Sequence, residues 1–159
     1  GTWRMLNSPP ATSPPPTTPT TPTPTAGPVF TPFSPFRVYD SRNGDGPLAT
    51  GENRLVSVEN QIDVDTGAVV KTGSVPKGTT AIAFNITLAR TQVSGFVSVT
   101  PGSATELSAS TINWTSSGSA VANGTFVTLD DDAQIRVFCG GPVGASTEFI
   151  IDVVGIVTG

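Results

Sequence analysis

The densest group of charged side chains in this sequence is Arg37, Asp40 and Arg42, three residues within a stretch of six. Charged residues make up only 13% of the chain, so such a cluster is unusual for it. In an extended strand Asp40 and Arg42 share a face and Arg37 lies on the other, unless a bulge intervenes. A guanidinium fork at Arg42 could bind a carboxylate or sugar hydroxyls. We favour a structural interpretation, in which Arg37 and Arg42 form an ion pair with Asp40 that fixes the exit of a strand into the turn at 43–46.

A second candidate site is Trp114, which follows Asn113. An exposed aromatic ring beside an amide can stack on a sugar ring and hydrogen-bond to it. Trp114, Asn113 and Arg42 are therefore the candidate ligand-binding residues. The alternative is a core tryptophan, because Ile112 and Trp114 point the same way on one strand. The core interpretation is the one we favour.

Two acidic groups, Asp63 with Asp65 and the run at 130–132, could in principle serve a glycosidase or bind calcium. Neither has the spacing of a calcium loop with a distal bidentate Glu. A glycosidase also needs a cleft lined by several aromatic residues, and this chain has only eight Phe, two Trp and one Tyr. We interpret both groups as acidic turns.

Histidine is absent and Cys139 is the single cysteine. No Ser-His-Asp or Cys-His arrangement and no ordinary Cys/His zinc site can be assembled without them. We expect Cys139 to be a buried free thiol, with intermolecular pairing as the alternative. The sequence thus predicts a non-enzymatic protein with no catalytic residue, no metal site and no cofactor.

The charge pattern also restricts the partners. Lys and Arg total eight, the formal net charge is −4, and no basic run exists, so we expect no nucleic-acid binding. The longest apolar run, at 149–154, is interrupted by Asp152 and is far too short to span a bilayer, so we expect no membrane insertion.

From Phe36 onward, β-branched and aromatic residues alternate with small polar ones. The segment 81–88 puts Ile82, Phe84, Ile86 and Leu88 on one face, and 147–157 reads as the most apolar strand. Turn signals such as Asn123-Gly124 separate the strands. About nine short strands predict an all-β fold, an antiparallel β-sandwich that resembles a jelly roll. Because uncharged strand edges recruit other strands, we expect oligomerisation or packing of the preceding segment along the head.

That preceding segment, 8–35, holds eleven of the fifteen prolines, mixed with Thr and Ser. Proline fixes φ and lacks an amide donor, which favours extended polyproline II. We therefore divide the chain into 1–7, the tail of an upstream segment or an N-terminal anchor, 8–35, a Pro/Thr-rich stalk, and 36–159, a β-sandwich head. Because the sequence starts at Gly1 without Met, we expect a processed product or a fragment of a longer chain.

Several motifs of the head occur together in one order. They are the segments 33–44, 75–76 leading into 83–87, 95–102, 110–114, 122–123 and 151–155. In this order they resemble a β-domain of secreted and cell-wall-associated actinobacterial proteins and of virion proteins of phages that infect actinobacteria. The resemblance implies a β-fold and a surface setting; it implies no defined ligand.

Together these features predict a structural and display module, foremost a phage virion component such as a tail, fibre or capsid decoration. Its expected partners are sister subunits or other surface proteins, contacted through the stalk and the head, and host envelope glycan. Its expected location is the virion surface or the cell exterior. The alternative is a glycan- or cell-wall-binding module of a secreted actinobacterial protein.

Overall fold

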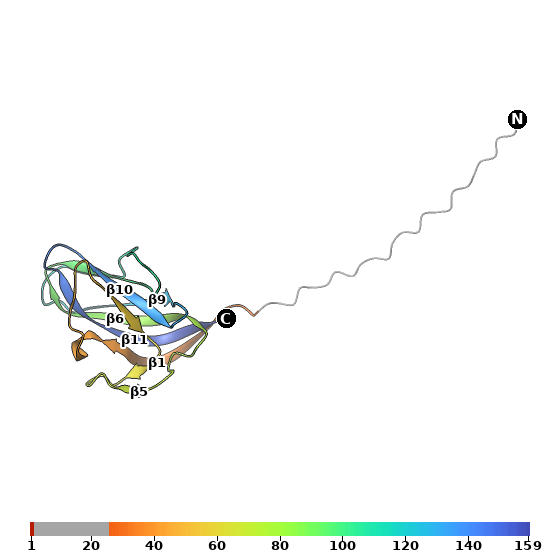
Figure 1. Cartoon of the computed structure of the whole chain (residues 1–159), viewed down its shortest axis with the longest axis horizontal. Helices are drawn as coiled ribbons and strands as arrows, with labels where there is room; N and C mark the ends of the chain where they lie inside the picture. The colour runs from red at the N-terminus through yellow and green to blue at the C-terminus, as the bar shows by residue number, and fades with distance from the viewer. Residues whose placement is uncertain (2–25) are drawn as a thin grey trace.

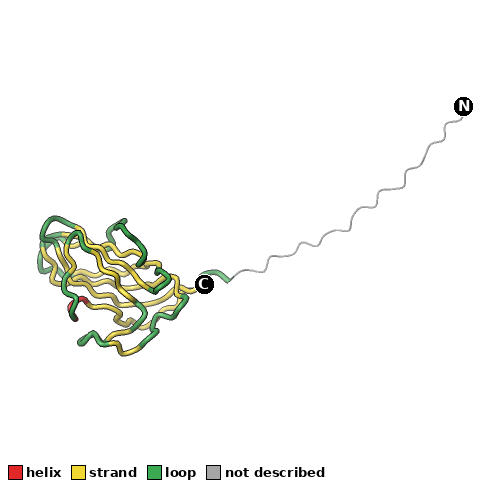
Figure 2. The backbone as a smooth tube through the Cα atoms, viewed as in Figure 1, coloured by secondary structure: helices red, strands yellow, loops and turns green. Residues whose placement is uncertain are grey.

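The computed structural model describes Gly1 and residues 26–159 of the chain. Within this part the fold is all-β, which confirms the predicted fold class (Figures 1 and 2). The strands are β1 (Val29–Asp40), β2 (Leu48–Ala49), β3 (Asn53–Ser57), β4 (Gln61–Ile62), β5 (Val69–Lys71), β6 (Thr79–Gln92), β7 (Gly95–Pro101), β8 (Ile112–Trp114), β9 (Val121–Thr128), β10 (Gln134–Gly140) and β11 (Ser146–Thr158). A short 3-10 helix, η1 (Ser41–Asn43), follows β1.

Two antiparallel sheets form the sandwich. The five-stranded sheet has the order β1-β11-β6-β9, with β2 also paired to β11, and the four-stranded sheet has the order β3-β10-β7-β8. In both sheets an early strand pairs with a late one, β1 with β11 and β3 with β10, as in a jelly roll. The pair β4-β5 forms a separate small hairpin that lies near β1.

The first strand corrects the predicted boundary between stalk and head. Residues 29–35, assigned to the stalk, belong to β1 and pair with β11, where Pro32 lies opposite Gly155. Proline is tolerated here because β1 is an edge strand, and the pairing shifts register between Pro32 and Phe36. The head therefore begins before residue 36. The remaining stalk residues, 8–25, and the predicted tail beyond Gly1 lie outside the described residues.

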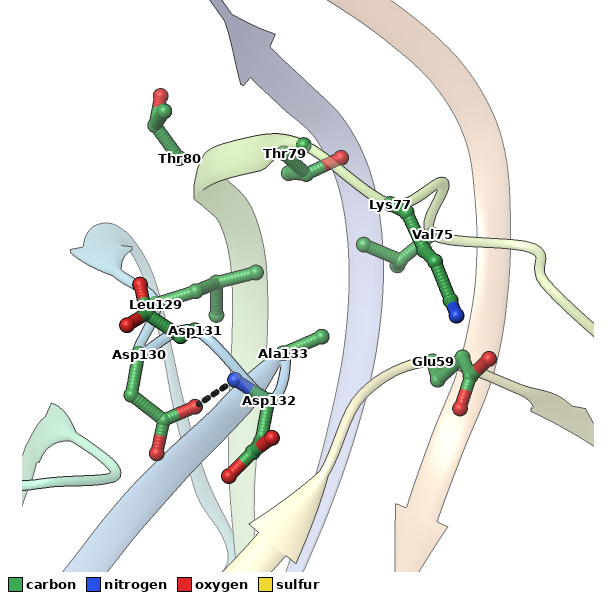
Figure 3. Close-up of a pocket in the computed structure, with 11 residues that line it drawn as sticks. Glu59, Val75, Lys77, Thr79, Thr80, Leu129, Asp130, Asp131, Asp132 and Ala133 are labelled. Carbon is green, nitrogen blue, oxygen red and sulfur yellow. Dashed lines mark hydrogen bonds between the residues drawn. The ribbon is translucent and has the colours of Figure 1, made fainter.

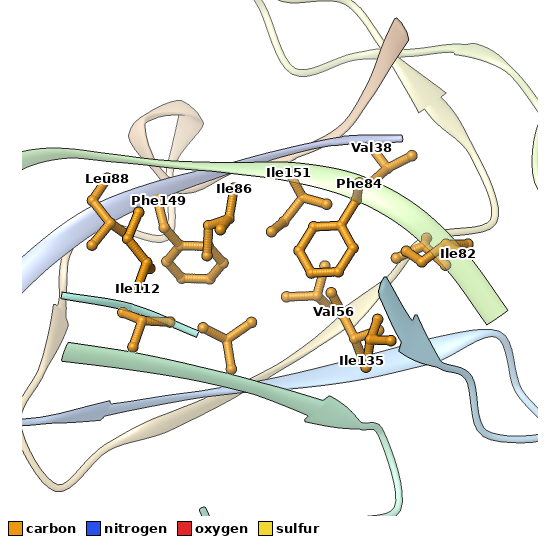
Figure 4. Close-up of a cluster of buried hydrophobic side chains, with 14 of the residues drawn as sticks. Val38, Val56, Ile82, Phe84, Ile86, Leu88, Ile112, Ile135, Phe149 and Ile151 are labelled. Carbon is orange, nitrogen blue, oxygen red and sulfur yellow. The ribbon is translucent and has the colours of Figure 1, made fainter. Parts of the chain in front are cut away.

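The core fills the space between the sheets (Figure 4). Ile82, Phe84, Ile86 and Leu88 of β6 are all fully buried on one face, as their alternation predicts. Strand β11 lies between β1 and β6, and consecutive residues along it are buried on both faces, which explains why its sequence is so apolar. One turn prediction was wrong: Asn123-Gly124 lies inside β9, opposite β6.

The two ends of the sandwich differ in what they carry. The start of β1 pairs with the end of β11, so the chain enters and leaves the head at one end, where Gly159 lies beside Pro28 (Figure 1). We call this the terminal end. The last residue of β1, Asp40, pairs with Ile150 toward the opposite end, which holds the loops at 93–94, 115–120 and 141–145. We call this the distal end.

Candidate functional site

The cluster at Arg37, Asp40 and Arg42 is a compact ion-pair network. The Asp40 side chain is only 1% exposed. Arg37 Nη1 donates to Asp40 Oδ2 at 3.0 Å, and Arg42 Nη2 donates to the same oxygen at 2.6 Å. Arg42 also donates to Asp40 Oδ1 from Nε at 2.8 Å and from its backbone N–H at 3.1 Å. Asp40 thus accepts two charged side chains and caps η1 at its N-terminus.

A fourth residue, Asp152 of β11, joins this network. Arg37 Nε donates to Asp152 Oδ1 at 2.9 Å, and Nη2 donates to Oδ2 at 3.3 Å. The two contacts form a bidentate pair across the β1–β11 ladder, where Arg37 and Asp152 are register partners. We refer to Arg37, Asp40, Arg42 and Asp152 as the Asp40 network.

A bulge decides how these side chains meet. The pairing of β1 with β11 shifts register between Arg37 and Tyr39, and this shift brings Arg37 and Asp40 to the same side of the sheet. Simple alternation would put Arg37 on the opposite face from Asp40; the strand instead adopts the alternative arrangement, with a bulge. Because Nε and Nη2 of Arg42 are both bonded to Asp40, its guanidinium fork faces this carboxylate.

The network fixes the charge of Asp40. Burial alone would raise the pKa of its carboxyl, but the hydrogen bonds from Arg42 and the positive charges of Arg42 and Arg37 together hold that pKa below its ordinary value. Asp40 is therefore ionised at neutral pH. An ionised carboxylate has no proton to donate, so Asp40 is not a general acid. Because it is bonded to two arginines, it is suited to anchoring the end of β1.

Buried polar contacts extend the network toward the distal end. Ser41 Oγ donates to Glu148 Oε2 and accepts from the backbone N–H of Phe149 at 2.9 Å, so η1 is bonded to β11. Tyr39 Oη donates to Asp45 Oδ2 at 2.7 Å. Burial and this hydrogen bond raise the pKa of Tyr39 well above its ordinary value, so the phenol remains a neutral donor.

Arg54 of β3 completes this part of the structure. Its Nη1 donates to Tyr39 Oη at 3.0 Å and to the carbonyl of Gly46 at 2.9 Å. The loop between η1 and β2 is thus held by a side chain from the four-stranded sheet. These contacts connect the two sheets and the loop, so the polar groups involved stabilise the fold.

Trp114 lies in the core, so it offers no exposed face for a sugar. Its side chain is 2% exposed, and its ring lies against Gly95 of β7, where no Cβ would fit. Trp114 Nε1 donates to the carbonyl of Gln92 at 3.2 Å. Asn113 is exposed and donates from Nδ2 to Ser110 Oγ at 3.1 Å. The structure therefore separates the aromatic ring from the amide that was predicted to act with it.

A cleft lies at the terminal end, between the turn before β6 and the turn after β9 (Figure 3). Its volume is about 530 Å³. The lining residues are Glu59, Val75, Lys77, Gly78, Thr79, Thr80, Leu129, Asp130, Asp131, Asp132 and Ala133. Four carboxylates against one ammonium group make it acidic, which suits a ligand with hydroxyl donors or a positive charge.

The acidic run at 130–132 is a hydrogen-bonded turn on one wall of this cleft. Asp130 Oδ1 accepts from the backbone N–H groups of Asp132 at 3.1 Å and Gln134 at 2.8 Å, while Asp131 and Asp132 are exposed. Within residues 26–159, no group of three or more acidic or Cys side chains is arranged to hold a metal ion. The cleft itself was not predicted, because Glu59, Lys77 and the threonines of β6 meet the acidic turn only through the fold.

The other predicted chemical residues have structural surroundings. Asp63 Oδ1 accepts from Thr66 N at 2.9 Å and Thr66 Oγ1 at 2.9 Å, and these hydrogen bonds lower the pKa of Asp63 in an exposed turn. Cys139 is a buried free thiol, as predicted. Burial raises its pKa to about 11, so the thiol is protonated and unreactive at neutral pH.

No protein-family model matches the chain, and no curated protein matches it. In the part of the chain that the structure describes, no helix has the length and apolar character needed to cross a membrane.

Proposed function

We propose that this chain is a non-enzymatic display module of a phage virion, in which the jelly-roll head serves assembly or attachment to the host surface. The observation that carries this proposal is the position of the termini. The chain enters β1 and leaves β11 side by side at the terminal end, and the Pro/Thr-rich segment joins the head there. A head held at one end can present its opposite end to a partner.

The distal end has features of a contact surface. Val143 is 97% exposed and Val93 is 43% exposed, in loops that lie against each other near Gly144. Val93 has a φ of +58°, a left-handed conformation that is strained for a β-branched residue. The backbone N–H of Val93 donates to Ser117 Oγ at 2.8 Å, which ties the loop to its neighbour. Strained, exposed apolar residues of this kind are typical of binding loops.

The Asp40 network supports a structural role for the charged residues. Asp40 and Asp152 both accept guanidinium hydrogen bonds, and Ser41 is bonded to Glu148. Their hydrogen-bonding capacity is used between strands. The order of the motifs that resemble the actinobacterial and phage β-domain supports the virion setting and the host envelope as a partner.

The acidic cleft favours one alternative, a module that binds glycan or cell wall in a secreted protein. Hydroxyl-rich or amine-bearing wall polymers would match its carboxylates and its threonines, Thr79 and Thr80. In this case the functional surface would be at the terminal end and the distal loops would be dispensable.

Quantitative detection of the chain in purified particles tests the proposal. A virion component copurifies with density-purified phage in a fixed copy number per particle. A chain that is absent from particles and is retained by isolated actinobacterial cell wall would contradict the proposal.

Two matched variants then locate the surface used. Val143→Asp should abolish host attachment with an unchanged melting temperature, because the side chain is in solvent. Asp131→Ala, which changes the cleft at an exposed position, should leave attachment intact. The reverse result would assign function to the cleft.

A further inference from the structure

One flank of the sandwich is almost free of charge. Between Arg90 and Asp130 the chain has 39 residues, and Glu106 is the single charged residue among them. This segment contains β7, β8 and β9, so the flank formed by β8 and β9 carries no charged side chain on its strands. The head as a whole is not uncharged, because the Asp40 network and Arg54 lie on the opposite flank. The low charge is therefore a property of the β8–β9 flank and not of the whole head.

Strand β9 is the edge of the five-stranded sheet on this flank, and Asn123 Nδ2 bonds its first half to the carbonyl of Thr111, just before β8, at 2.8 Å. It is the last strand of the five-stranded sheet, paired with β6 and, among the described strands, with no other. The pairing runs for eight residues without a register shift. Ala122, Gly124, Phe126 and Thr128 are exposed, and Phe126 is 63% exposed. A long, regular edge strand without charge or proline exposes backbone groups that another strand can pair with.

The other edge of the same sheet is protected. Strand β1 carries Pro32 and Pro35, which have no N–H to donate, and its ladder with β11 has two register shifts. These features obstruct a further strand at this edge. A head-to-tail contact of β9 with β1 of the next copy, which would propagate into a filament, is therefore disfavoured. What remains open within this sheet is pairing of β9 with another β9.

The absence of charge selects a second copy of the chain as the occupant. In a two-fold antiparallel contact each side chain near the axis lies opposite or diagonal to its own symmetry mate, so a charged residue would repel itself. β9 contains none. A partner recognised through charge, in contrast, would find no complementary group on β8 or β9.

We propose that β9 pairs with β9 of a second copy, antiparallel about a two-fold axis, and joins the two five-stranded sheets into one continuous sheet. The inference rests on the proposed assembly role and specifies the surface that assembly uses. The distal loops and the terminal end stay free in this arrangement, because both lie at the ends of the strands.

Sedimentation of the full chain over a wide concentration range tests the dimer. Ala122→Lys and Thr128→Lys put a charge at exposed β9 positions whose side chains make no hydrogen bond. The matched control is Leu55→Lys, at a 43% exposed position of the edge strand β3. We expect a wild-type dimer, at least tenfold weaker association in each β9 variant, and no change in the control. A monomeric wild type, or equal weakening by the control, overturns the proposal.

Spin labels test the geometry independently. Single cysteines replace Ala122, Gly124 or Thr128 in turn; Cys139 can stay because it is buried and its pKa is raised to about 11. Gly124→Cys is acceptable because a Cβ there meets no atom within 4 Å. Antiparallel pairing predicts that the distance between the two labels is shortest at one β9 position and increases at positions farther along the strand. The distance at Leu55→Cys should be longer than any of these. A label distance shorter at position 55 than along β9 overturns it.

These outcomes separate the two proposals. A monomeric chain that copurifies with particles in fixed copy number would refute β9 pairing and leave the display function standing. A β9-linked dimer that is absent from particles and binds cell wall would refute the display function and leave the pairing standing.

Discussion

The two flanks of this sandwich are stabilised by different physical means. On the β1 flank, partly exposed guanidinium groups are bonded to the buried carboxylate of Asp40, and η1 is bonded to β11 through Ser41. On the β8–β9 flank the strands have no charge, and Trp114 fills the space beside Gly95. One flank depends on electrostatics and the other on apolar packing.

This difference bears on how the surface can be used. Proline and bulges in β1 obstruct pairing with a further strand, whereas β9, whose pairing is regular, can pair with one. A domain with both sheet edges protected would remain monomeric, and a domain with both sheet edges open would form filaments or aggregates. The asymmetry between the flanks permits a limited assembly.

The largest expected effect comes from the packing flank. Trp114→Ala removes a fully buried ring and leaves a cavity beside Gly95, which should lower the free energy of unfolding by about 4 kcal/mol. Urea denaturation measures this loss. Asn113→Ala, at the neighbouring exposed position, should change the free energy of unfolding by less than about 0.5 kcal/mol. If both variants were equally stable, Trp114 would not anchor this flank.

A somewhat smaller effect is expected on the charged flank. Asp40→Ala leaves Arg42 without its carboxylate partner and removes the cap of η1, which should cost about 3 kcal/mol of unfolding free energy. Urea denaturation again gives the value. Asp131→Ala, which removes an exposed carboxylate, is the matched control and should be nearly neutral. Unchanged stability of Asp40→Ala together with lost ligand binding would make Asp40 a binding residue.

Patterns carried by a single strand were predictable from sequence. The period-two alternation of Ile82, Phe84, Ile86 and Leu88 defines the buried face of β6, because each strand alternates independently of its neighbours. The all-β fold follows from many such segments. The meeting of Arg37 with Asp40 was predictable only conditionally, because a bulge depends on how β1 pairs with β11.

The predictions that failed concern features that depend on contacts between segments distant in sequence. Pro32 and Pro35 predicted a stalk by local propensity, yet pairing at an edge of the sheet places them in β1. Asn123-Gly124 predicted a turn, yet both residues continue a strand opposite Asn85 and Ile86. The cleft joins turns far apart in sequence. Neither the sheet order nor the edge positions can be derived from local patterns alone.

The pH dependence of stability should separate the flanks further. Arg42 and Arg37 lower the pKa of Asp40 in the folded protein below its unfolded value of about 3.9. The ionised form therefore stabilises the fold above about pH 4, and this contribution is lost as pH falls through the folded pKa. We expect Asp40→Asn to flatten the acid side of the curve of unfolding free energy against pH.

The control for this prediction lies on the uncharged flank. Trp114→Phe should lower the whole curve and keep its acid slope, because no titrating group is removed. The pKa of Asp63 is also lowered, by hydrogen bonds from Thr66, so Asp63 contributes to the acid slope as well and Asp40→Asn should remove only part of it. An acid slope unchanged in Asp40→Asn would show that the network does not govern acid stability.

The smallest effect on folding is expected at the exposed edge. Phe126 meets Phe30 edge to face, with ring centroids 5.8 Å apart, and is otherwise largely in solvent. Phe126→Ala should therefore cost less than about 1 kcal/mol of unfolding free energy. Phe30→Ala should cost more, because Phe30 also covers Gly155, where a Cβ would lie 2.5 Å from its ring.

These two variants must be measured where the chain is monomeric, since association adds to apparent stability by mass action. At such dilution Phe126 contributes through its single aromatic contact. At high concentration the same variant should lose more stability than Phe30→Ala, because Phe126 is on β9 and Phe30 on β1. A concentration-independent ranking would mean that Phe126 serves the fold alone. A change of ranking with concentration would tie the uncharged flank to contact between copies.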